Sequence, residues 1–150
     1  TDLENPPQFV DAAEDDVNQG RDLAYPAAFA NQQRKAYPDL APIEVALSLE
    51  DALVKAQSIA QKFGWKIVSL DSAGALEAQD TSKLFHFVDD IVVRITPLEP
   101  ATPSDASNTT TDGNAAPRVR IDIRSKSRDG QGDLGANARR IARFSAAFSG

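Results

Sequence analysis

The stretch RVRIDIRS at residues 118–125 alternates polar and apolar side chains from Arg118 to Arg124. A period of two places successive side chains on opposite faces of a β-strand, so this stretch predicts a strand with one buried face. The apolar face consists of Val119, Ile121 and Ile123. The opposite face consists of Arg118, Arg120, Asp122 and Arg124. The strand therefore predicts a sheet with one apolar face and one charged face.

A second alternating stretch, IVVRIT at residues 91–96, has the same two-faced pattern and places Arg94 on its polar face. If the two strands are neighbours, Arg94 lies on the same surface as Arg120 and Asp122. Three interpretations of this surface stay open. It is a solvated sheet face with cross-strand ion pairs, a basic concave surface for an anionic ligand or partner, or an oligomer interface.

The other secondary-structure elements follow from apolar spacing and from capping residues. A helix is expected over 49–63, because apolar residues recur at helical spacing between the N-cap Ser48 and the C-terminal stop Gly64. A second helix is expected near residues 134–148, with Asp133 as its N-cap. The further strands are expected at 43–48, 65–70, 73–80, 83–87 and 89–97.

The expected order of these elements is β-α-β-β-β-β-β-α. Strands so close in sequence pair antiparallel, and two amphipathic helices cover only one face of the resulting sheet. We therefore predict an α+β fold, a two-layer sandwich. Its antiparallel sheet has about five to six strands, with two helices on one face and the other face open.

Composition divides the chain into two parts. Residues 1–42 are predicted to form an extended N-terminal arm, and a disordered linker is the alternative. Residues 43–150 are predicted to form the α+β domain, in which residues 98–117, rich in Pro, Ser, Thr, Gly and Asn, form a flexible insertion loop. The candidate aromatic anchors of the arm are Phe9, Tyr25, Phe29 and Tyr37.

The charge distribution limits the classes of partner. The formal net charge is -6, although residues 118–150 carry eight basic and three acidic side chains. A nucleic-acid-binding domain is usually basic overall, so this local basic character favours a small anion or an acidic partner surface. No nucleic-acid partner is predicted.

Residue usage limits the chemistry. The chain has no cysteine and a single histidine, His86, which excludes thiol catalysis and a typical zinc site, and no cofactor is expected. His86 lies on the expected strand 83–87 and is interpreted as a packed residue rather than a catalytic base. No apolar run is long enough for a transmembrane helix. Because the chain starts at Thr1 and has no methionine, we expect it to be a processed or truncated piece of a longer product.

The stretch RSKSRDGQGDLGANARRIARF at residues 124–144 leads from a strand through three glycines into the second helix. Such an entry offers N–H groups to an anion, and Arg124, Lys126 and Arg128 could add charge-assisted hydrogen bonds. The stretch matches neither a GxxxxGK[ST] loop nor a GxGxxG fingerprint, so a structural joint is favoured over an anion site. In such a joint, Arg128 pairs with Asp90, Asp129 or Asp133.

Polar residues near this joint carry two further predictions. Asn137, at the edge of the apolar stripe of the second helix, is expected to pin the preceding loop or the Asp89–Asp90 turn through backbone hydrogen bonds. A ligand contact is the alternative. Asp89 and Asp90 are adjacent on a strand, so their side chains point to opposite faces and do not form a catalytic dyad. Asp90 is expected to form an ion pair with Arg94 or Arg128.

These residues resemble an uncharacterised family, domain of unknown function 1499 (DUF1499). Its phrase DxRSxSRxGxxDLGxNxxRI is similar to residues 122–141, and its phrase FxDDxxxRx is similar to residues 87–95. YPDLAP at 37–42 and GW at 64–65 fit as well, and the NPP near the start resembles members from Alphaproteobacteria. In related bacterial proteins this domain often follows membrane helices. The resemblance therefore implies a periplasmic or otherwise extracytoplasmic domain, but no known activity, cofactor or catalytic residue.

Three hypotheses of function follow. The favoured one is a binding or accessory module that contacts a partner protein or small anionic ligand through the 124–137 loop and the open sheet face. The first alternative is a hydrolase or transferase acting on a phosphorylated or carboxylated substrate, with Asp90 as base and Arg128 as anion clamp. The second is a structural or assembly domain of a membrane protein. Catalysis is not favoured, and no catalytic or metal-binding residue is predicted.

The candidate ligand-binding residues are Arg94, Arg120, Asp122, Arg124, Ser125, Ser127, Arg128, Asn137 and Arg140. The structural or acidic candidates are Asp89, Asp90 and Asp133.

Overall fold

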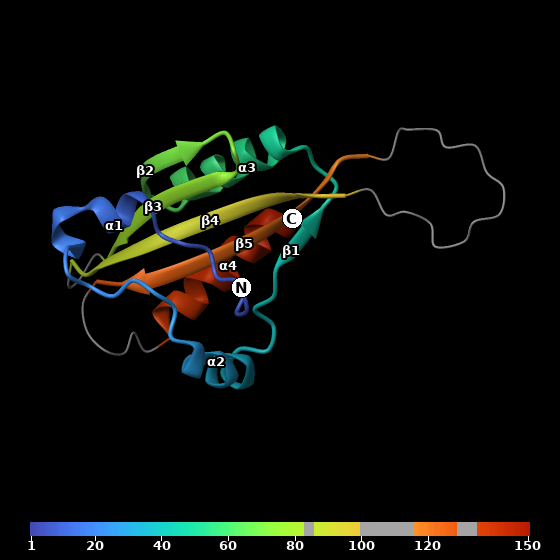
Figure 1. Ribbon diagram of the computed structural model, residues 1–150. Coiled ribbons are helices and arrows are strands. Elements are labelled where there is room, and N and C mark those ends of the chain that lie inside the picture. The colour runs from blue at the N-terminus through green and yellow to red at the C-terminus, as the bar shows by residue number, and fades with distance from the viewer. Residues whose placement is uncertain (83–85, 100–115, 129–134) are drawn as a thin grey trace.

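The computed structural model describes residues 1–82, 86–99, 116–128 and 135–150. Within them, a five-stranded antiparallel sheet has the order β1-β5-β4-β3-β2 (Figure 1). The strands are β1 (Ile43–Val45), β2 (Lys66–Asp71), β3 (Ala75–Thr81), β4 (Val88–Leu98) and β5 (Arg118–Ser127). The helices α3 (Leu49–Lys62) and α4 (Ala136–Ser149) lie together behind the sheet, which confirms the predicted α+β sandwich.

The two longest strands are those with the alternating patterns. β4 and β5 pair antiparallel along their length, and the register places Arg94 opposite Asp122. The alternation sends Val93, Ile121 and Ile123 into the core between the sheet and the helices, where all three are fully buried. The predicted inward face is therefore confirmed, and so is the neighbourhood of Arg94 and Asp122.

The helices begin and pack as their sequences indicate. Ser48 caps α3, because its Oγ accepts a hydrogen bond from the Asp51 N–H at 3.0 Å. In the core, the Trp65 ring stacks on the Phe144 ring of α4 with centroids 5.7 Å apart. Phe144 and Phe148, both on α4, are the largest of the fully buried side chains.

The N-terminal arm covers the second face of the sheet. It contains two short α-helices, α1 (Asp11–Glu14) and α2 (Ala30–Ala36), and two 3₁₀ turns, η1 (Asp16–Asn18) and η2 (Ala27–Phe29). In Figure 1 the blue N-terminal segment crosses in front of the sheet, opposite α3 and α4. Phe9 and Ala12 are buried against Val92 of β4 in a second hydrophobic cluster. The prediction of an open face is therefore wrong, because the apolar residues of the arm and of β4 are stabilised by mutual burial.

Glu77 of β3 fastens the arm to this face. Its side chain is buried, and its carboxylate accepts hydrogen bonds from the N–H groups of Val10 and Asp11, and from that of Ala12 at 2.8 Å. The first N–H groups of a helix have no partner within the helix, so the carboxylate satisfies donors that α1 leaves open. Among the predicted anchors, Phe9 is buried, whereas Phe29 and Tyr37 keep large exposed surfaces.

Three predictions concern connections between elements. Of the expected strand 83–87, the structure describes His86 and Phe87, and neither of them is in a strand. Both residues lie between β3 and β4, and His86 has a left-handed φ of 55°. His86 is also exposed rather than packed. Most of the expected insertion loop 98–117, together with Asp129 and Asp133, lies outside the described residues. The prediction of Asp133 as the N-cap of the second helix is wrong, because α4 begins at Ala136 with Gly135 as its N-cap.

Candidate functional site

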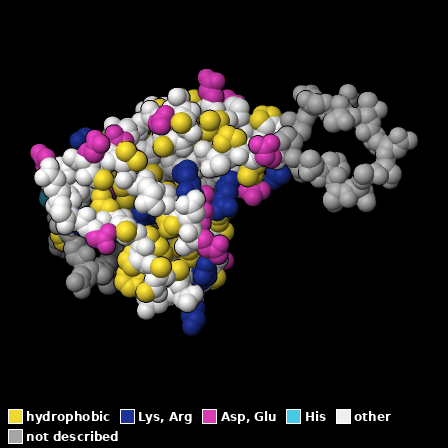
Figure 2. Space-filling model, in the orientation of Figure 1, with side chains coloured by type: hydrophobic (Ala, Val, Ile, Leu, Met, Phe, Trp, Pro, Cys, Tyr) yellow, Lys and Arg dark blue, Asp and Glu magenta, His cyan; other side chains and the backbone are white. Residues whose placement is uncertain are grey.

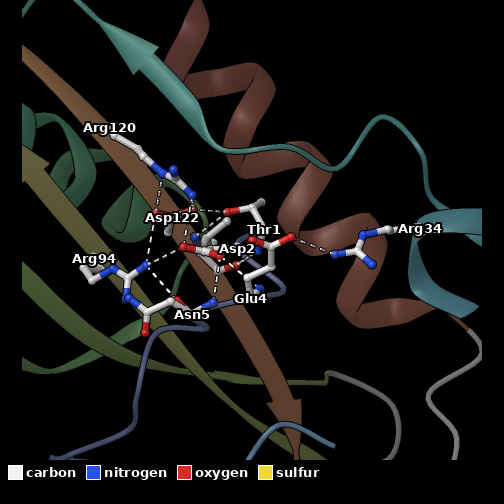
Figure 3. A network of polar contacts seen from close by, with 9 residues as sticks. Thr1, Asp2, Glu4, Asn5, Arg34, Arg94, Arg120 and Asp122 are labelled. Carbon is white, nitrogen blue, oxygen red and sulfur yellow. Dashed lines mark hydrogen bonds and ion pairs between the residues drawn. The ribbon is translucent and has the colours of Figure 1, made fainter. Parts of the chain in front are cut away.

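The charged residues of β4 and β5 form a network with the start of the arm (Figure 3). Asp122 is 1% exposed and accepts hydrogen bonds from Arg94 Nη2 at 3.2 Å and Arg120 Nε at 3.0 Å. Asp2 of the arm forms ion pairs with the same two arginines, at 3.1 and 3.0 Å. Thr1 Oγ1 donates to Asp122 Oδ1 at 3.0 Å. Arg94 and Arg120 are therefore paired with carboxylates, one from the sheet and one from the arm.

The interleaving of charges extends over this face of the molecule. Figure 2 shows Lys and Arg side chains beside Asp and Glu side chains rather than gathered in one separate basic patch. Of the interpretations of the charged face, the structure matches cross-strand ion pairs, with the arm adding further carboxylates.

Asp2 should make the stability of the protein depend on pH in the acidic range. Burial alone raises the pKa of Asp2, but hydrogen bonds from the Asn5 and Glu4 N–H groups, together with Arg120 and Arg94, outweigh it and hold the pKa below 3.8. A lowered carboxyl pKa contributes stability that is present above 3.8 and is lost as the pH falls through the folded-state pKa. We therefore expect the free energy of unfolding to decrease less between about pH 5 and pH 3 in Asp2→Asn than in the wild type.

Urea unfolding of the wild type and of Asp2→Asn at both pH values measures this difference. Asp39→Asn is the matched control, because Asp39 lies in the arm, is exposed and takes part in no ion pair within the described residues. Equal pH dependence in the wild type and Asp2→Asn would contradict the prediction.

Arg128 joins the end of β5 to the arm. Its guanidinium donates to both carboxylate oxygens of Asp90, at 2.8 and 2.7 Å, and to Asp15 at 2.9 Å. The hydrogen bonds with Asp90 raise the pKa of Arg128, and the hydrogen bond from Arg128 lowers the pKa of Asp15. Asn18 Nδ2 also donates to Asp90, which is 2% exposed. The predicted ion pair between Arg128 and Asp90 is confirmed, and Arg94 pairs elsewhere.

A third cluster lies on the helix side of the same strands. Arg140 of α4 donates to Asp80 at 2.9 Å and to Asp89 at 2.5 Å. Asn137 Oδ1 accepts hydrogen bonds from Ser125 Oγ at 2.6 Å and from Arg140 Nη1 at 2.7 Å. Asn137 is thus linked to Asp89 through the Arg140 side chain, which joins α4 to β4.

The adjacent acids Asp89 and Asp90 point to opposite faces, as predicted. Asp89 contacts Arg140 on the helix side, whereas Asp90 contacts Arg128 and Asn18 on the arm side. The strand therefore places the two carboxylates in separate ion pairs.

Arg124 differs from the other arginines of β5 in having no carboxylate within ion-pair distance among the described residues. Its side chain is 7% exposed, and its guanidinium donates to the carbonyl oxygens of Pro7, at 3.1 Å, and Leu23. The same guanidinium lies 4.8 Å from the centre of the Phe9 ring. Burial lowers the pKa of Arg124, and the nearby Tyr25 and Asp22 offset this only in part. A buried cation is therefore held by carbonyls and aromatic rings.

Lys126 adds a second cation on the same face of β5. Burial lowers the pKa of Lys126, and Arg124 and then Arg21 lower it further, while Asp22 opposes them. Arg21 donates to the Ser127 carbonyl at 3.3 Å. Arg124, Lys126 and Arg21 therefore form a cluster of three neighbouring cations, which we call the cation cluster.

A groove of about 1020 Å³ runs beside the cation cluster. β1 pairs with β5 only from Val119 to Ile121, so within the described residues the rest of β5 forms an edge on this side. The arm forms one wall of the groove, and the N-terminal half of α4 forms the other. The cation cluster, Ser125, Ser127 and Asn137 are among the residues that line it. With Gly135, the groove thus brings together six described residues of the 124–137 stretch and a part of the arm.

The candidate residues therefore fall into separate places. Arg94, Arg120 and Asp122 form the network with Asp2 and do not line the groove, although Asp2 does, and Arg128 and Arg140 are bound to aspartates. Sequence reasoning missed Arg21 and Tyr25 as groove residues, because they lie about 100 residues from β5 along the chain. Tyr25 was predicted only as an aromatic anchor of the arm, and no feature of the sequence pointed to Arg21.

The described part of the chain offers neither a metal centre nor a membrane-spanning helix. No group of three or more His, Asp or Glu side chains there could hold a metal ion. No helix there is long and apolar enough to cross a membrane.

The family comparison covers almost the whole chain. A family model described as a protein of unknown function, DUF1499, matches residues 1–148. The chain belongs to the DUF1499 family. Among curated proteins, no sequence matches the chain. The DUF1499 match includes the arm as well as the sheet, in line with the packing of the arm on the sheet face. The description of DUF1499 names no activity.

Proposed function

We propose that this DUF1499 domain is a non-catalytic binding module for a small anionic ligand, which lies in the groove against Arg124 and Lys126. The observation that carries the proposal is the buried Arg124 without a carboxylate partner among the described residues, next to Lys126 and Arg21. Arg118 and Arg120, the other arginines of β5, and Arg128 just after it each have such a partner. The cation cluster is therefore the place where a bound negative charge would be stabilised most.

The physical basis is the cost of buried charge. Desolvation disfavours the charged forms of Arg124 and Lys126, and each cation also repels the other. The attraction of an anion in the groove would offset both the desolvation of the two cations and their mutual repulsion. The anion would also accept charge-assisted hydrogen bonds. Only two of the five guanidinium N–H donors of Arg124 are used by protein acceptors among the described residues, which leaves donors for a ligand.

The hydrolase or transferase alternative is less well supported. It requires Asp90 as an accessible base beside Arg128. Asp90 is almost fully buried, and its two oxygens accept hydrogen bonds from Arg128 and Asn18. A substrate would have to displace these contacts before Asp90 could act as a base.

Lys126→Ala is expected to weaken the binding of acetate and of inorganic phosphate roughly 10-fold or more, because a charge-assisted hydrogen bond contributes about 1.5–3 kcal/mol. The fold should be unaffected, because Lys126 forms no ion pair within the described residues. Two-dimensional NMR titration of the ¹⁵N-labelled chain with each anion measures the affinity and locates the shifted amides.

Lys66→Ala is the matched control, since Lys66 is an exposed lysine on β2 that does not line the groove. It should bind both anions as the wild type does. If Lys126→Ala also binds them as the wild type does, the proposal is wrong. The same holds if neither anion shifts amides of residues 123–127.

We also propose an extracytoplasmic location, which rests on the resemblance to proteins in which this domain follows membrane helices. Fractionation of cells that express the natural full-length protein tests it, and recovery of this domain from the cytoplasm would contradict it. A protein partner and an assembly role stay predictions.

A further inference from the structure

The groove has two chemically different sides. Because side chains alternate along β5, Arg124 and Lys126 project toward the arm, whereas Ile123 and Ser125 project toward α4. The α4 side of the groove is lined by Ala138, which is partly exposed, and by Ile123 and Ile141, which are buried in the core. A ligand in the groove would therefore meet cations on the arm side of the β5 edge and a small apolar surface on the α4 side.

The arm adds apolar surface over the same groove. Phe29 and Tyr37 line it and are 54% and 40% exposed. Figure 2 shows hydrophobic side chains gathered over the part of the molecule where Figure 1 places α2. Large apolar side chains that face a groove and stay exposed are stabilised when a ligand covers them.

The size and the acids of the groove narrow the class of ligand. Its volume of about 1020 Å³ is far larger than acetate or phosphate needs and is in the range of sites for drug-sized molecules. Asp2 and Asp22 also line the groove and offset two of the three positive charges of the cation cluster, so a head group with a single negative charge balances the lining side chains. These features together favour one negative charge joined to a long apolar body.

Building on the proposed anion site, we infer that the ligand is a carboxylate with an alkyl chain, of the fatty-acid class. The carboxylate lies against Arg124 and Lys126, and the chain lies between α4 and the exposed aromatic side chains of the arm. The carboxylate offsets the unpaired charge of the cation cluster, and the chain covers Phe29 and Tyr37.

Calorimetric titration of the full chain with acetate, decanoate and 1-decanol, each below its aggregation concentration, tests this inference. Affinity rises about fourfold for each methylene that is fully buried, so decanoate should bind at least ~100-fold more tightly than acetate. 1-Decanol, which has the chain without the charge, should bind at least ~10-fold more weakly than decanoate. Decyl phosphate, which adds charge to the head group, should also bind more weakly than decanoate.

Phe29→Ser tests the apolar side of the groove, and the exposed Val54 of α3 supplies the matched control Val54→Ser. We expect Phe29→Ser to lower the affinity for decanoate about 10-fold without changing that for acetate, and Val54→Ser to change neither.

The outcomes separate the two proposals. Equal affinity for acetate and decanoate, both lost in Lys126→Ala, would overturn the alkyl-chain inference and leave the anion site standing. Tighter binding of decyl phosphate would overturn the assignment of a carboxylate head group. If 1-decanol and decanoate bind with equal affinity, and if Lys126→Ala changes neither affinity, both the anion site and the inference that rests on it are wrong. Absence of binding by all four compounds would overturn both.

Discussion

Replacing Arg128 with alanine is expected to lower the free energy of unfolding by about 3–5 kcal/mol, which is typical when one partner of a buried ion pair is removed. Asp90 is 2% exposed and accepts two hydrogen bonds from Arg128. Without Arg128 its charge stays buried, with Asn18 as its remaining side-chain donor within the described residues. Urea unfolding followed by the fluorescence of Trp65, which is buried in the core, measures the loss.

Two further variants show whether the buried charge is the cause. Adding Asp90→Asn to Arg128→Ala should recover part of the lost stability, because the unpaired charge is removed. Arg118→Ala breaks the ion pair with Glu44, in which both side chains are about half exposed, and should cost less than about 1 kcal/mol. If Arg128→Ala costs no more than Arg118→Ala, the structural role assigned to Arg128 is wrong.

This prediction bears on function, because Arg128 stands in the phrase that resembles the family pattern and was a candidate anion clamp. Its guanidinium is already bound to Asp90 and Asp15. Arg124 stands four residues earlier on the same face of β5 and lacks such a partner within the described residues. We expect Arg128→Ala to lose stability, and we expect Lys126→Ala to stay folded but to lose anion binding. Together these results would show that Arg128 has a structural role in this phrase and that Lys126 has a binding role.

Gly74→Ala is expected to be the second large effect, with a cost on the order of 4 kcal/mol from backbone strain and overpacking together. Gly74, between β2 and β3, has a φ of +113°, which residues with a side chain rarely adopt. A β-carbon at this position would lie 2.2 Å from the Ile95 carbonyl oxygen. The Ile95 N–H donates to the Gly74 carbonyl at 2.7 Å, so the two backbones cannot separate without loss of this bond.

Gly64→Ala is the matched control for this prediction. Gly64 also has a positive φ, +78°, but nothing lies within 4 Å of the position its β-carbon would take. It should therefore cost only the strain of the left-handed backbone, about 1–2 kcal/mol. Thermal and urea unfolding of the two variants measure the difference, and equal losses would show that the close approach to Ile95 is unimportant.

The layers of the fold could be predicted from local patterns. Val119, Ile121 and Ile123 alternate with charged residues, and this period is typical of a strand with one apolar face. Ser48 and Gly64 mark the ends of α3 through hydrogen bonds and backbone angles within a few residues. The strand expected at 83–87 is absent at His86 and Phe87, the two residues of this range that the structure describes. An apolar run this short does not distinguish a strand from other conformations.

The candidate site was predicted less well. The sequence indicated that Arg94 and Asp122 share a surface, and that Arg128 pairs with an acid that could be Asp90. It gave no means to foresee that Asp2 and Asp15, more than 90 residues away, would complete these pairs. Nor could it distinguish Arg124 from its neighbours on the same strand, since all of them read as exposed charges on an open face.

The sequence by itself determined the five strands of the sheet, the two long helices and the apolar face of β5, because these depend on side-chain periodicity and on caps within a few residues. Only the tertiary structure decided that the arm covers the charged face. Its docking depends on contacts between distant segments, such as Glu77 with the start of α1 and Phe9 with Val92. That docking pairs Arg94, Arg120 and Arg128 with carboxylates and buries Arg124 without one among the described residues, and it thereby creates the groove.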